Sequence, residues 1–279
     1  IDYKFFSVQR IVIMLCISFK LSLKEGKHVF GTNLPVQSAD LIERIGYIGY
    51  DWVMIDDEHV FNNDETMANM IRAAEVANMT PLIRLRDPSP SWCYQFLDMG
   101  VGGIILSHTE SAEEVLGLID ACKFPPEGHR GATNKARAMK FGLDYIGQDK
   151  RLADLNEETF LMPLVETLAG IEQLEAIAGV DGVDGVFIGP GDLALDMGVP
   201  FGSDEVLEKV DQAIATVVKA GKFPCTISSG SMAKSYIEKG VSLVLAMINY
   251  DAPIVNLSLI HISEPTRPRL ISYAVFCLK

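Results

Sequence analysis

The chain has 279 residues, of which 48% are hydrophobic and 22% charged, and its 37 acidic against 24 basic residues give a formal net charge of -13. These proportions predict a soluble globular protein with room for one large domain or two small ones. An acidic chain of this kind repels nucleic-acid phosphates and anionic lipid, so we expect neither nucleic acid nor membrane as a partner. The five cysteines form no Cys-x-x-Cys pair, which favours a reducing, cytoplasmic setting.

The two ends of the chain do not read as parts of a domain. The apolar run from Ile11 to Ile17 is too short to span a bilayer, and no small-residue cleavage site follows it. We interpret residues 1–13 as upstream translation before a true start near Met14. Residues 257–279 resemble the conceptual translation of a transposon-type sequencing adapter, the alternative being a genuine strand and tail. On the adapter interpretation His261 and Cys277 belong to no site, and one domain spans 14–256.

Between these ends, short β-rich runs alternate with amphipathic stretches, a pattern typical of a parallel α/β fold. The candidate strands are 28–33, 51–57, 81–86, 103–107, 160–166, 185–189, 223–228 and 242–248. Their number is that of a (β/α)8 TIM barrel, although a doubly wound sheet can also be drawn from an alternating pattern. We therefore predict a single TIM-barrel domain.

Helical spacing lies between the strands, in stretches that begin near Asp40, Asp64, Ser91, Ala112, Gly170, Glu205 and Met232. Ser111-Ala-Glu-Glu is typical of a capped helix start, and glycines such as Gly46 and Gly100 are expected to close helices before the next strand. The eighth helix should begin near Asp251, where the adapter-like tail soon follows. We therefore expect the barrel to lack a native eighth helix.

A barrel carries its reactive groups at the C-terminal ends of its strands. Residues 56–59 (Asp-Asp-Glu-His) end the second strand, Arg84 the third and Glu166 the fifth, and Asp192 follows the sixth. The sequence thus predicts that these polar groups converge on one rim.

Glu166 and Asp192 are the candidate metal ligands. A carboxylate that closes the apolar strand Met162-Pro-Leu-Val-Glu is costly unless it is paired or bound to a cation. Two carboxylates on adjacent strands suit a hard ion such as Mg2+ or Mn2+. The alternative is that each is an ordinary loop or helix-capping acid. Gly191, just before Asp192, lets the backbone come close to a ligand.

The run Ile55-Asp-Asp-Glu-His-Val cannot serve one centre as a whole, because an extended strand points Asp56 and Glu58 to one side and Asp57 to the other. His59 can accept a proton near neutral pH when a carboxylate orients it, although a lone histidine is often only a surface or core residue. Arg84 can hold a carboxylate or developing enolate through its planar fork. Arg86 faces the other way and is expected to be structural.

Five motifs in this order carry a resemblance to a known family: Ile55-Asp-Asp-Glu-His, Pro81-Leu-Ile-Arg, Phe96-Leu-Asp-Met-Gly, Phe124-Pro-Pro-Glu-Gly-His-Arg-Gly and Gly182-Val-Asp-Gly-Val-Phe-Ile-Gly-Pro-Gly-Asp-Leu. From about Phe19 to about Val255 the chain resembles the HpcH/HpaI aldolases. The resemblance implies a class II, metal-dependent pyruvate aldolase, usually oligomeric, that cleaves 2-keto-3-deoxy sugar acids or 4-hydroxy-2-oxo acids to pyruvate and an aldehyde.

The resemblance also implies roles for the acid-base residues. His59 would be the general base, Asp98 in Leu-Asp-Met-Gly the acid that supports it, and Asp56 a further polar partner. Arg84 would stabilise the transition state.

It likewise implies that Glu166 and Asp192 bind Mg2+, Mn2+ or Co2+, and that Gly191 and Asp192 contact the substrate. Where the sugar-acid aldolases place a glutamine two residues before the metal-binding Glu, this chain has Leu164, so a hydrogen bond to the substrate is lost. Two alternatives stay open: a citryl- or malyl-type lyase on a related barrel, and a truncated, inactive barrel that binds a metabolite.

Overall fold

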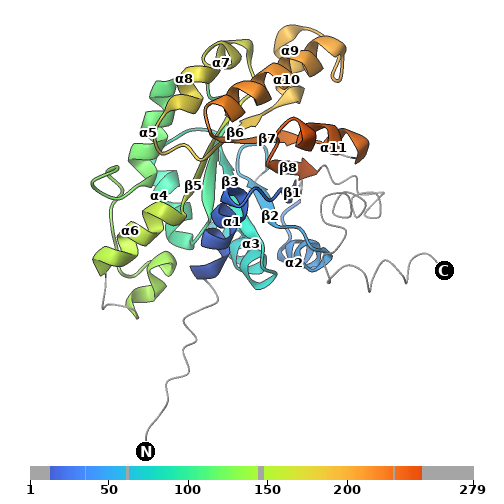
Figure 1. Ribbon diagram of the computed structural model, residues 1–279. Coiled ribbons are helices and arrows are strands. Elements are labelled where there is room, and N and C mark those ends of the chain that lie inside the picture. The colour runs from blue at the N-terminus through green and yellow to red at the C-terminus, as the bar shows by residue number, and fades with distance from the viewer. Residues whose placement is uncertain (1–12, 35, 61–62, 144–147, 229, 247–279) are drawn as a thin grey trace, which may run out of the picture.

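A computed structural model describes residues 13–34, 36–60, 63–143, 148–228 and 230–246, and these form a closed barrel of eight parallel strands (Figure 1). The strands are β1 (Val29–Asn33), β2 (Trp52–Asp56), β3 (Thr80–Leu85), β4 (Gly103–Leu106), β5 (Phe160–Val165), β6 (Gly185–Ile188), β7 (Phe223–Ile227) and β8 (Leu243–Ala246). Each pairs with the next in sequence, and β8 pairs with β1. The predicted TIM barrel is confirmed, and the doubly wound alternative is wrong because such a sheet keeps two open edges.

Helices surround the strands in Figure 1, and the predicted ones are present. They are α2 (Ala39–Ile48), α3 (Asp64–Val76), α4 (Pro90–Met99), α5 (Ala112–Cys122), α7 (Leu168–Glu172), α8 (Leu174–Gly179), α10 (Asp204–Lys219) and α11 (Gly230–Glu238). Ser111 forms the expected capping box with Glu114. Gly100 ends α4 with a left-handed φ of 95°. Among the helices of the described residues, none has the length and apolar run that crossing a membrane requires.

Four further elements were not predicted: α1 (Ile13–Lys24), α6 (Gln148–Glu158), α9 (Pro190–Met197) and the 3-10 segment η2 (Arg137–Gly142). Pro190-Gly191 looks like a turn in sequence, yet a proline also fits the first position of a helix. The interpretations of the chain ends, and the expected start of an eighth helix near Asp251, concern residues that lie outside the described part of the chain, apart from Ile13 and Met14 at the start of α1.

Helix α1 closes the end of the barrel where the strands begin. The ring of Phe19 meets that of Phe160, the first residue of β5, edge-on with centroids 5.3 Å apart. Lys20 forms an ion pair of 2.8 Å with Asp184, which directly precedes β6. Because α1 covers the end of the barrel where the strands begin, an active site can form at the opposite rim, where the strands end.

The strands alternate between two apolar layers. In β2, Trp52 and Met54 belong to the cluster that fills the barrel, whereas Val53 and Ile55 pack against the helices. Each such buried side chain contributes about 1.5–3 kcal/mol of transfer free energy. The same alternation turns Asp56 inward, which is why a carboxylate stands at the mouth of the barrel.

The sequence predicted that Gly46 would close α2, and this was wrong. Gly46 lies inside α2, and Gly49 is its C-terminal cap. A Cβ at Gly46 would lie 2.4 Å from the Cβ of Ala77 and 2.9 Å from the Ala77 carbonyl oxygen. Gly46 is therefore the residue that lets α2 approach the end of α3.

We expect Gly46→Ala to destabilise the protein by about 1–3 kcal/mol, because the added methyl overpacks this contact. The matched control is Gly117→Ala inside α5, where a Cβ would meet nothing within 4 Å. Gly117→Ala should stabilise the protein by about 0.5–1 kcal/mol through helix propensity alone. Urea unfolding of both variants measures the difference, and equal shifts would contradict the packing role of Gly46.

Candidate active site

The turn after β2 is built around the carboxylate of Asp56. Its Oδ1 accepts hydrogen bonds from the backbone N–H groups of Glu58 and His59 at 2.9 and 3.3 Å and from Nε of Arg84 at 3.1 Å. Its Oδ2 accepts from Nη2 of Arg84 at 2.5 Å. Burial alone would raise the pKa of Asp56, but the hydrogen bonds and charge of Arg84 outweigh it and hold that pKa below its usual value. Asp56 thus supports His59 through the backbone.

The carboxylate beside the His59 ring is Glu58, which the sequence did not single out as a site residue. Its Oε2 lies 3.4 Å from Nε2 of His59 and 3.3 Å from Nη1 of Arg84, and it accepts a hydrogen bond of 2.8 Å from Oγ of Ser107. The Glu58 side chain is only 8% exposed, whereas that of His59 is 62% exposed. His59 therefore presents an accessible imidazole backed by a buried acid, an arrangement suited to accepting a proton.

Glu166 stands at the end of β5 with its side chain 4% exposed. Its Oε1 accepts the backbone N–H of His108 at 3.2 Å and lies 3.3 Å from Nδ1 of the same residue. Burial raises the pKa of Glu166 to about 7, and the negative charges of Asp192 and Glu58 add to the rise although His108 opposes it. The surroundings of Glu166 are therefore short of positive charge.

Asp192 approaches Glu166 from the first turn of α9. The residue that allows this is Gly189 at the end of β6, where an added Cβ would lie 2.8 Å from both Cβ and Oε2 of Glu166. At Gly191 an added Cβ would meet nothing within 4 Å. The backbone N–H of Gly191 is one of those that the start of a helix leaves without an intrahelical partner.

The chemistry of Glu166 and Asp192 fits a divalent cation, because both offer carboxylate oxygens where negative charge is in excess. Within the described ranges, no group of three or more His, Cys, Asp or Glu side chains is arranged to hold a metal ion. Two protein ligands would leave the other coordination positions to water and substrate.

Asp98 does not lie at this rim. It sits in the last turn of α4 and accepts a hydrogen bond of 2.7 Å from Nη2 of Arg130. Arg130 bonds to Lys123 through its backbone, and Nζ of Lys123 donates to the carbonyl of Thr159 just before β5 begins. Because a helix that follows a strand returns to the strand-start end of the barrel, Asp98 lies at the opposite end from His59. Within one chain the expected support of His59 by Asp98 is therefore not met.

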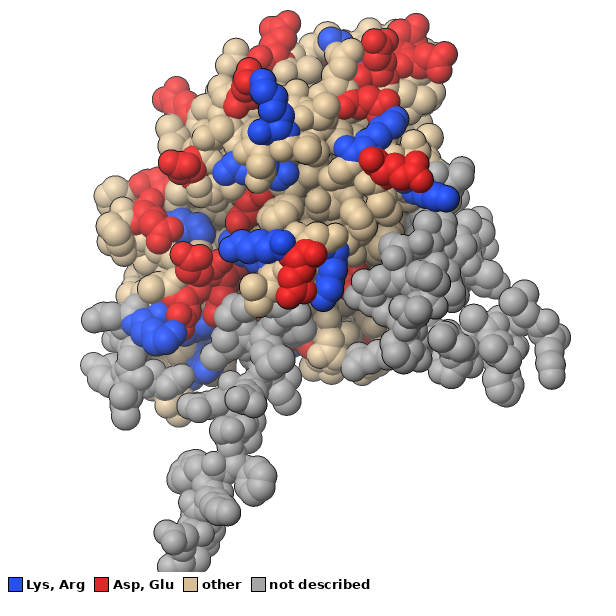
Figure 2. All heavy atoms as spheres, viewed as in Figure 1, with Lys and Arg blue, Asp and Glu red and all other residues tan. Residues whose placement is uncertain are grey.

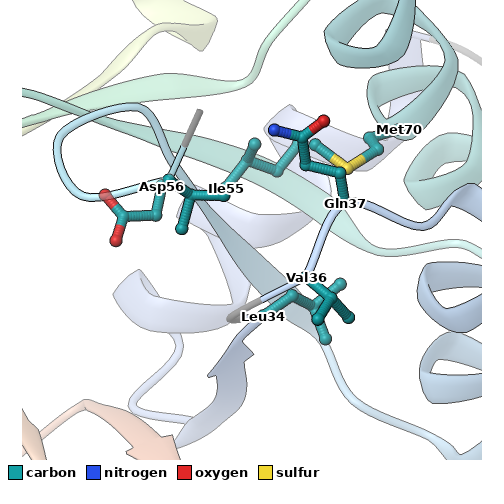
Figure 3. A pocket seen from close by; sticks show the side chains of 7 residues that line it. Leu34, Val36, Gln37, Ile55, Asp56 and Met70 are labelled. Atoms are coloured by element: carbon teal, nitrogen blue, oxygen red, sulfur yellow. The ribbon is translucent and has the colours of Figure 1, made fainter. Parts of the chain in front are cut away.

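A small pocket opens beside the rim and is lined by Leu34, Val36, Gln37, Ile55, Asp56, Val60 and Met70 (Figure 3). In that view the Asp56 carboxylate points away from the Gln37 amide, which lies beside Met70. Ile55 belongs to the layer under the helices and Met70 to α3. The pocket thus lies between barrel and helix, and it shares Asp56 with the rim.

Charges of both signs are interleaved on the face that Figure 2 shows, and acidic side chains gather where α9 and α10 lie. With a net charge of -13, the protein's overall field does not attract an anion. An anionic substrate therefore depends on local groups such as Arg84.

Residues 30–235 match the family described as HpcH/HpaI aldolase/citrate lyase. The chain belongs to this family. The resemblance drawn from its motifs is thereby confirmed.

Among relatives in the HpcH/HpaI family is the 4-hydroxy-2-oxo-heptane-1,7-dioate aldolase of Shigella sonnei, 34% identical over 81% of this chain and 87% of that protein. The hydroxypyruvate/pyruvate aldolase of Roseovarius nubinhibens is 36% identical over 74% and 79%, respectively. Similar solved structures include the citrate synthase SbnG, with a TM-score of 0.75, 28% identity and coverage of 88% and 96%. A family protein of Burkholderia cenocepacia J2315 has a TM-score of 0.77, 25% identity and coverage of 89% and 96%.

Two residues that contact this rim, Glu58 and His108, are not among the candidates predicted from the sequence. Glu58 lies two residues after Asp56, so an extended strand points both side chains to the same face, and this spacing could have identified Glu58 from the sequence. His108 follows β4 at the same rim, but no carboxylate adjoins it in sequence. Leu164, in contrast, lies where expected: buried in the barrel two residues before Glu166, where it presents no polar group.

We expect Glu166→Gln to raise the melting temperature of the metal-free protein at about pH 8. The folded pKa of about 7 lies above the ordinary value of 4.5, so wild-type stability is greatest below the lower value and falls as pH rises toward the higher one. The melting temperature should rise by about 2–4 °C for each kcal/mol by which the substitution increases the free energy of unfolding. The rise should nearly vanish at about pH 5, where Glu166 is protonated in the folded state. Calorimetry measures the melting temperature, with Glu172→Gln at an exposed position as the control. An unchanged melting temperature at about pH 8 would contradict the claim that a buried charge on Glu166 destabilises the metal-free protein.

Proposed function

We propose that the protein is a metal-dependent aldolase that cleaves a 4-hydroxy-2-oxo acid or a 2-keto-3-deoxy sugar acid to pyruvate and an aldehyde, and that joins them in reverse. The observation that supports this most is the meeting of His59, Arg84 and Glu166 at one rim, linked through Glu58. The names of the relatives agree, because the Shigella protein is called a 4-hydroxy-2-oxo-heptane-1,7-dioate aldolase and the Roseovarius protein a hydroxypyruvate/pyruvate aldolase.

In this proposal Glu166 and Asp192 hold Mg2+, Mn2+ or Co2+. A bound cation supplies a Lewis acid for the oxygens of the pyruvate half. Gly191 and Asp192 lie in the first turn of α9, so their backbone N–H groups can receive the substrate carboxylate. In this proposal the backbone N–H groups at the start of α9 bind the substrate carboxylate, and the carboxylates of Glu166 and Asp192 hold the cation.

Arg84 and His59 carry the charge and the proton. The guanidinium of Arg84 is held by Asp56 and Glu58, and its charge also interacts with Glu166 across the mouth of the barrel. It therefore stands where negative charge develops on the pyruvate half as the C3–C4 bond breaks. His59 accepts the proton of the 4-hydroxyl group, and Glu58 beside Nε2 stabilises the imidazolium that forms.

Self-association is part of the proposal, because Asp98 lies at the far end of its own barrel. A role for Asp98 beside His59 would require a neighbouring copy of the chain to supply it. Light scattering that gives a mass above 30.6 kDa would support a homo-oligomer, and a strictly monomeric active enzyme would remove Asp98 from the site.

The proposal is tested by coupled assay of pyruvate release from a panel of 4-hydroxy-2-oxo and 2-keto-3-deoxy acids, with and without EDTA. We expect release with at least one substrate class, loss on chelation and recovery on adding Mg2+ or Mn2+. Because a solved relative is a citrate synthase, oxaloacetate with an acetyl thioester belongs in the panel. Turnover of that pair alone would favour a citrate-type reaction, and full activity in EDTA would exclude the metal mechanism.

We expect Arg84→Lys to lower kcat by about 100- to 1000-fold, the usual cost of losing one donor that stabilises developing charge. Lysine keeps a charge beside Asp56, so the variant should fold, but it lacks the fork that bonds both carboxylate oxygens. The matched control is Arg86→Lys, since the Arg86 guanidinium lies 5.9 Å from the Trp92 ring centroid and should leave kcat unchanged. Equal kcat values for the two variants would contradict the role of Arg84.

A further inference from the structure

His108 is a second histidine of the rim, and the proposed chemistry gives it no role. It follows β4, which pairs with β3 on one side and with β5 on the other. Those neighbours carry Arg84 and Glu166, respectively. His108 therefore stands between the arginine's strand and the strand of the proposed metal ligand.

The contacts of His108 reach two carboxylates at once. Its backbone N–H donates to Oε1 of Glu166 at 3.2 Å, and its Nδ1 lies 3.3 Å from the same oxygen. On the other side of the ring, Nε2 lies 3.4 Å from Oε1 of Glu58. Glu58 in turn contacts His59 and Arg84 through its other oxygen. The imidazole thus bridges the acid of the base-and-arginine cluster and the acid of the metal pair.

The backbone at His108 is held in a conformation that side chains rarely adopt, with φ of 47°. The residues on both sides are fixed: Ser107 bonds to Leu85 and Glu58, and Thr109 to Leu164 and Leu106. A strained residue persists only where its surroundings over-determine it, and such residues cluster at functional sites. Here the strain brings both the N–H and the ring of one residue onto buried acids.

We propose that His108 is a positioning residue that holds the Glu166 and Glu58 carboxylates at a fixed separation, so that Glu166 faces the cation and Glu58 stays with Arg84 and His59. Two buried carboxylates repel each other, and the ring between them places Nδ1 against Glu166 and Nε2 against Glu58. As an imidazolium the ring carries an N–H on each nitrogen and donates toward both acids. This inference rests on the proposed function in one respect, namely that Glu166 is a metal ligand. It adds that the metal pair and the base are coupled through one imidazole.

Two variants separate the ring from the backbone. His108→Gly removes the ring, keeps the N–H that binds Glu166 and suits the left-handed backbone. His108→Asn also tolerates that backbone and returns one amide donor. The matched control is His129→Gly, because His129 is also paired with an acid, Asp120, but its side chain is 85% exposed on the loop at the strand-start end.

The readouts are Mn2+ affinity, by electron paramagnetic resonance of the free ion, and kcat/KM for pyruvate release with Mg2+. For His108→Gly we expect Mn2+ affinity and kcat/KM to fall by about 10- to 100-fold, as when groups that orient metal ligands are lost. His108→Asn should recover part of this loss. Added imidazole should restore kcat/KM in His108→Gly, because it can occupy the open position, and should not change wild-type protein or His129→Gly. A purely structural histidine would show no such rescue.

Glu166→Gln distinguishes the two levels of failure. If this variant binds Mn2+ as tightly as wild-type protein, the proposed metal site is wrong. If it binds weakly while His108→Gly keeps wild-type affinity and kcat/KM, the metal site stands and the positioning role is overturned. Should His108→Gly not fold, His108→Asn undergoes the same measurements, and wild-type values for it would likewise overturn the proposal.

Discussion

The site depends on an imbalance of buried charge at the mouth of the barrel. Asp56, Glu58 and Glu166 are each less than 10% exposed at their side chains, and Arg84, whose side chain is 13% exposed, forms ion pairs with the first two. Arg84 donates two hydrogen bonds to Asp56, which lower the pKa of Asp56. Among the described residues, Glu166 receives no such hydrogen bond from Arg84, and burial raises its pKa to about 7. The carboxylate that lacks a fixed counter-charge is thus the one positioned to gain from a divalent cation.

This imbalance follows from how a barrel is closed. Parallel strands end at one rim, and the register sets Asp56 beside Arg84 on the neighbouring strand. Glu166 stands one position beyond the last paired residues of β5 and β6, next to Gly189. Groups more than a hundred residues apart in sequence therefore meet. The strand ends supply most of the side chains of this site, and among the helices the first turn of α9 supplies Asp192. The walls are apolar, so charge placed at the rim is felt strongly.

The sequence predicted the strands and the inward-facing residues well, because period-two alternation and strand ends are local signals. His59, Arg84, Glu166 and Asp192 all lie at the predicted rim. Asp98 does not meet His59 within one chain, because a motif names a residue but does not say at which end of a helix, or in which copy of the chain, its partner lies. Glu58 and His108 were missed because their roles come from contacts between strands, which no short stretch of sequence displays.

By itself, then, the sequence determined the family, the order of strands and the residues that end them, since these depend on local patterns of burial and on motifs. Only the tertiary structure decided which carboxylate has a counter-charge, which histidine touches which acid and why Gly189 must lack a side chain. These depend on distances of 2.5 to 3.4 Å between strands, and electrostatic energies inside a protein change steeply over such distances. The run Asp-Asp-Glu-His after β2 supplies the acids, but their separate roles are set by Arg84 and His108 on the next two strands.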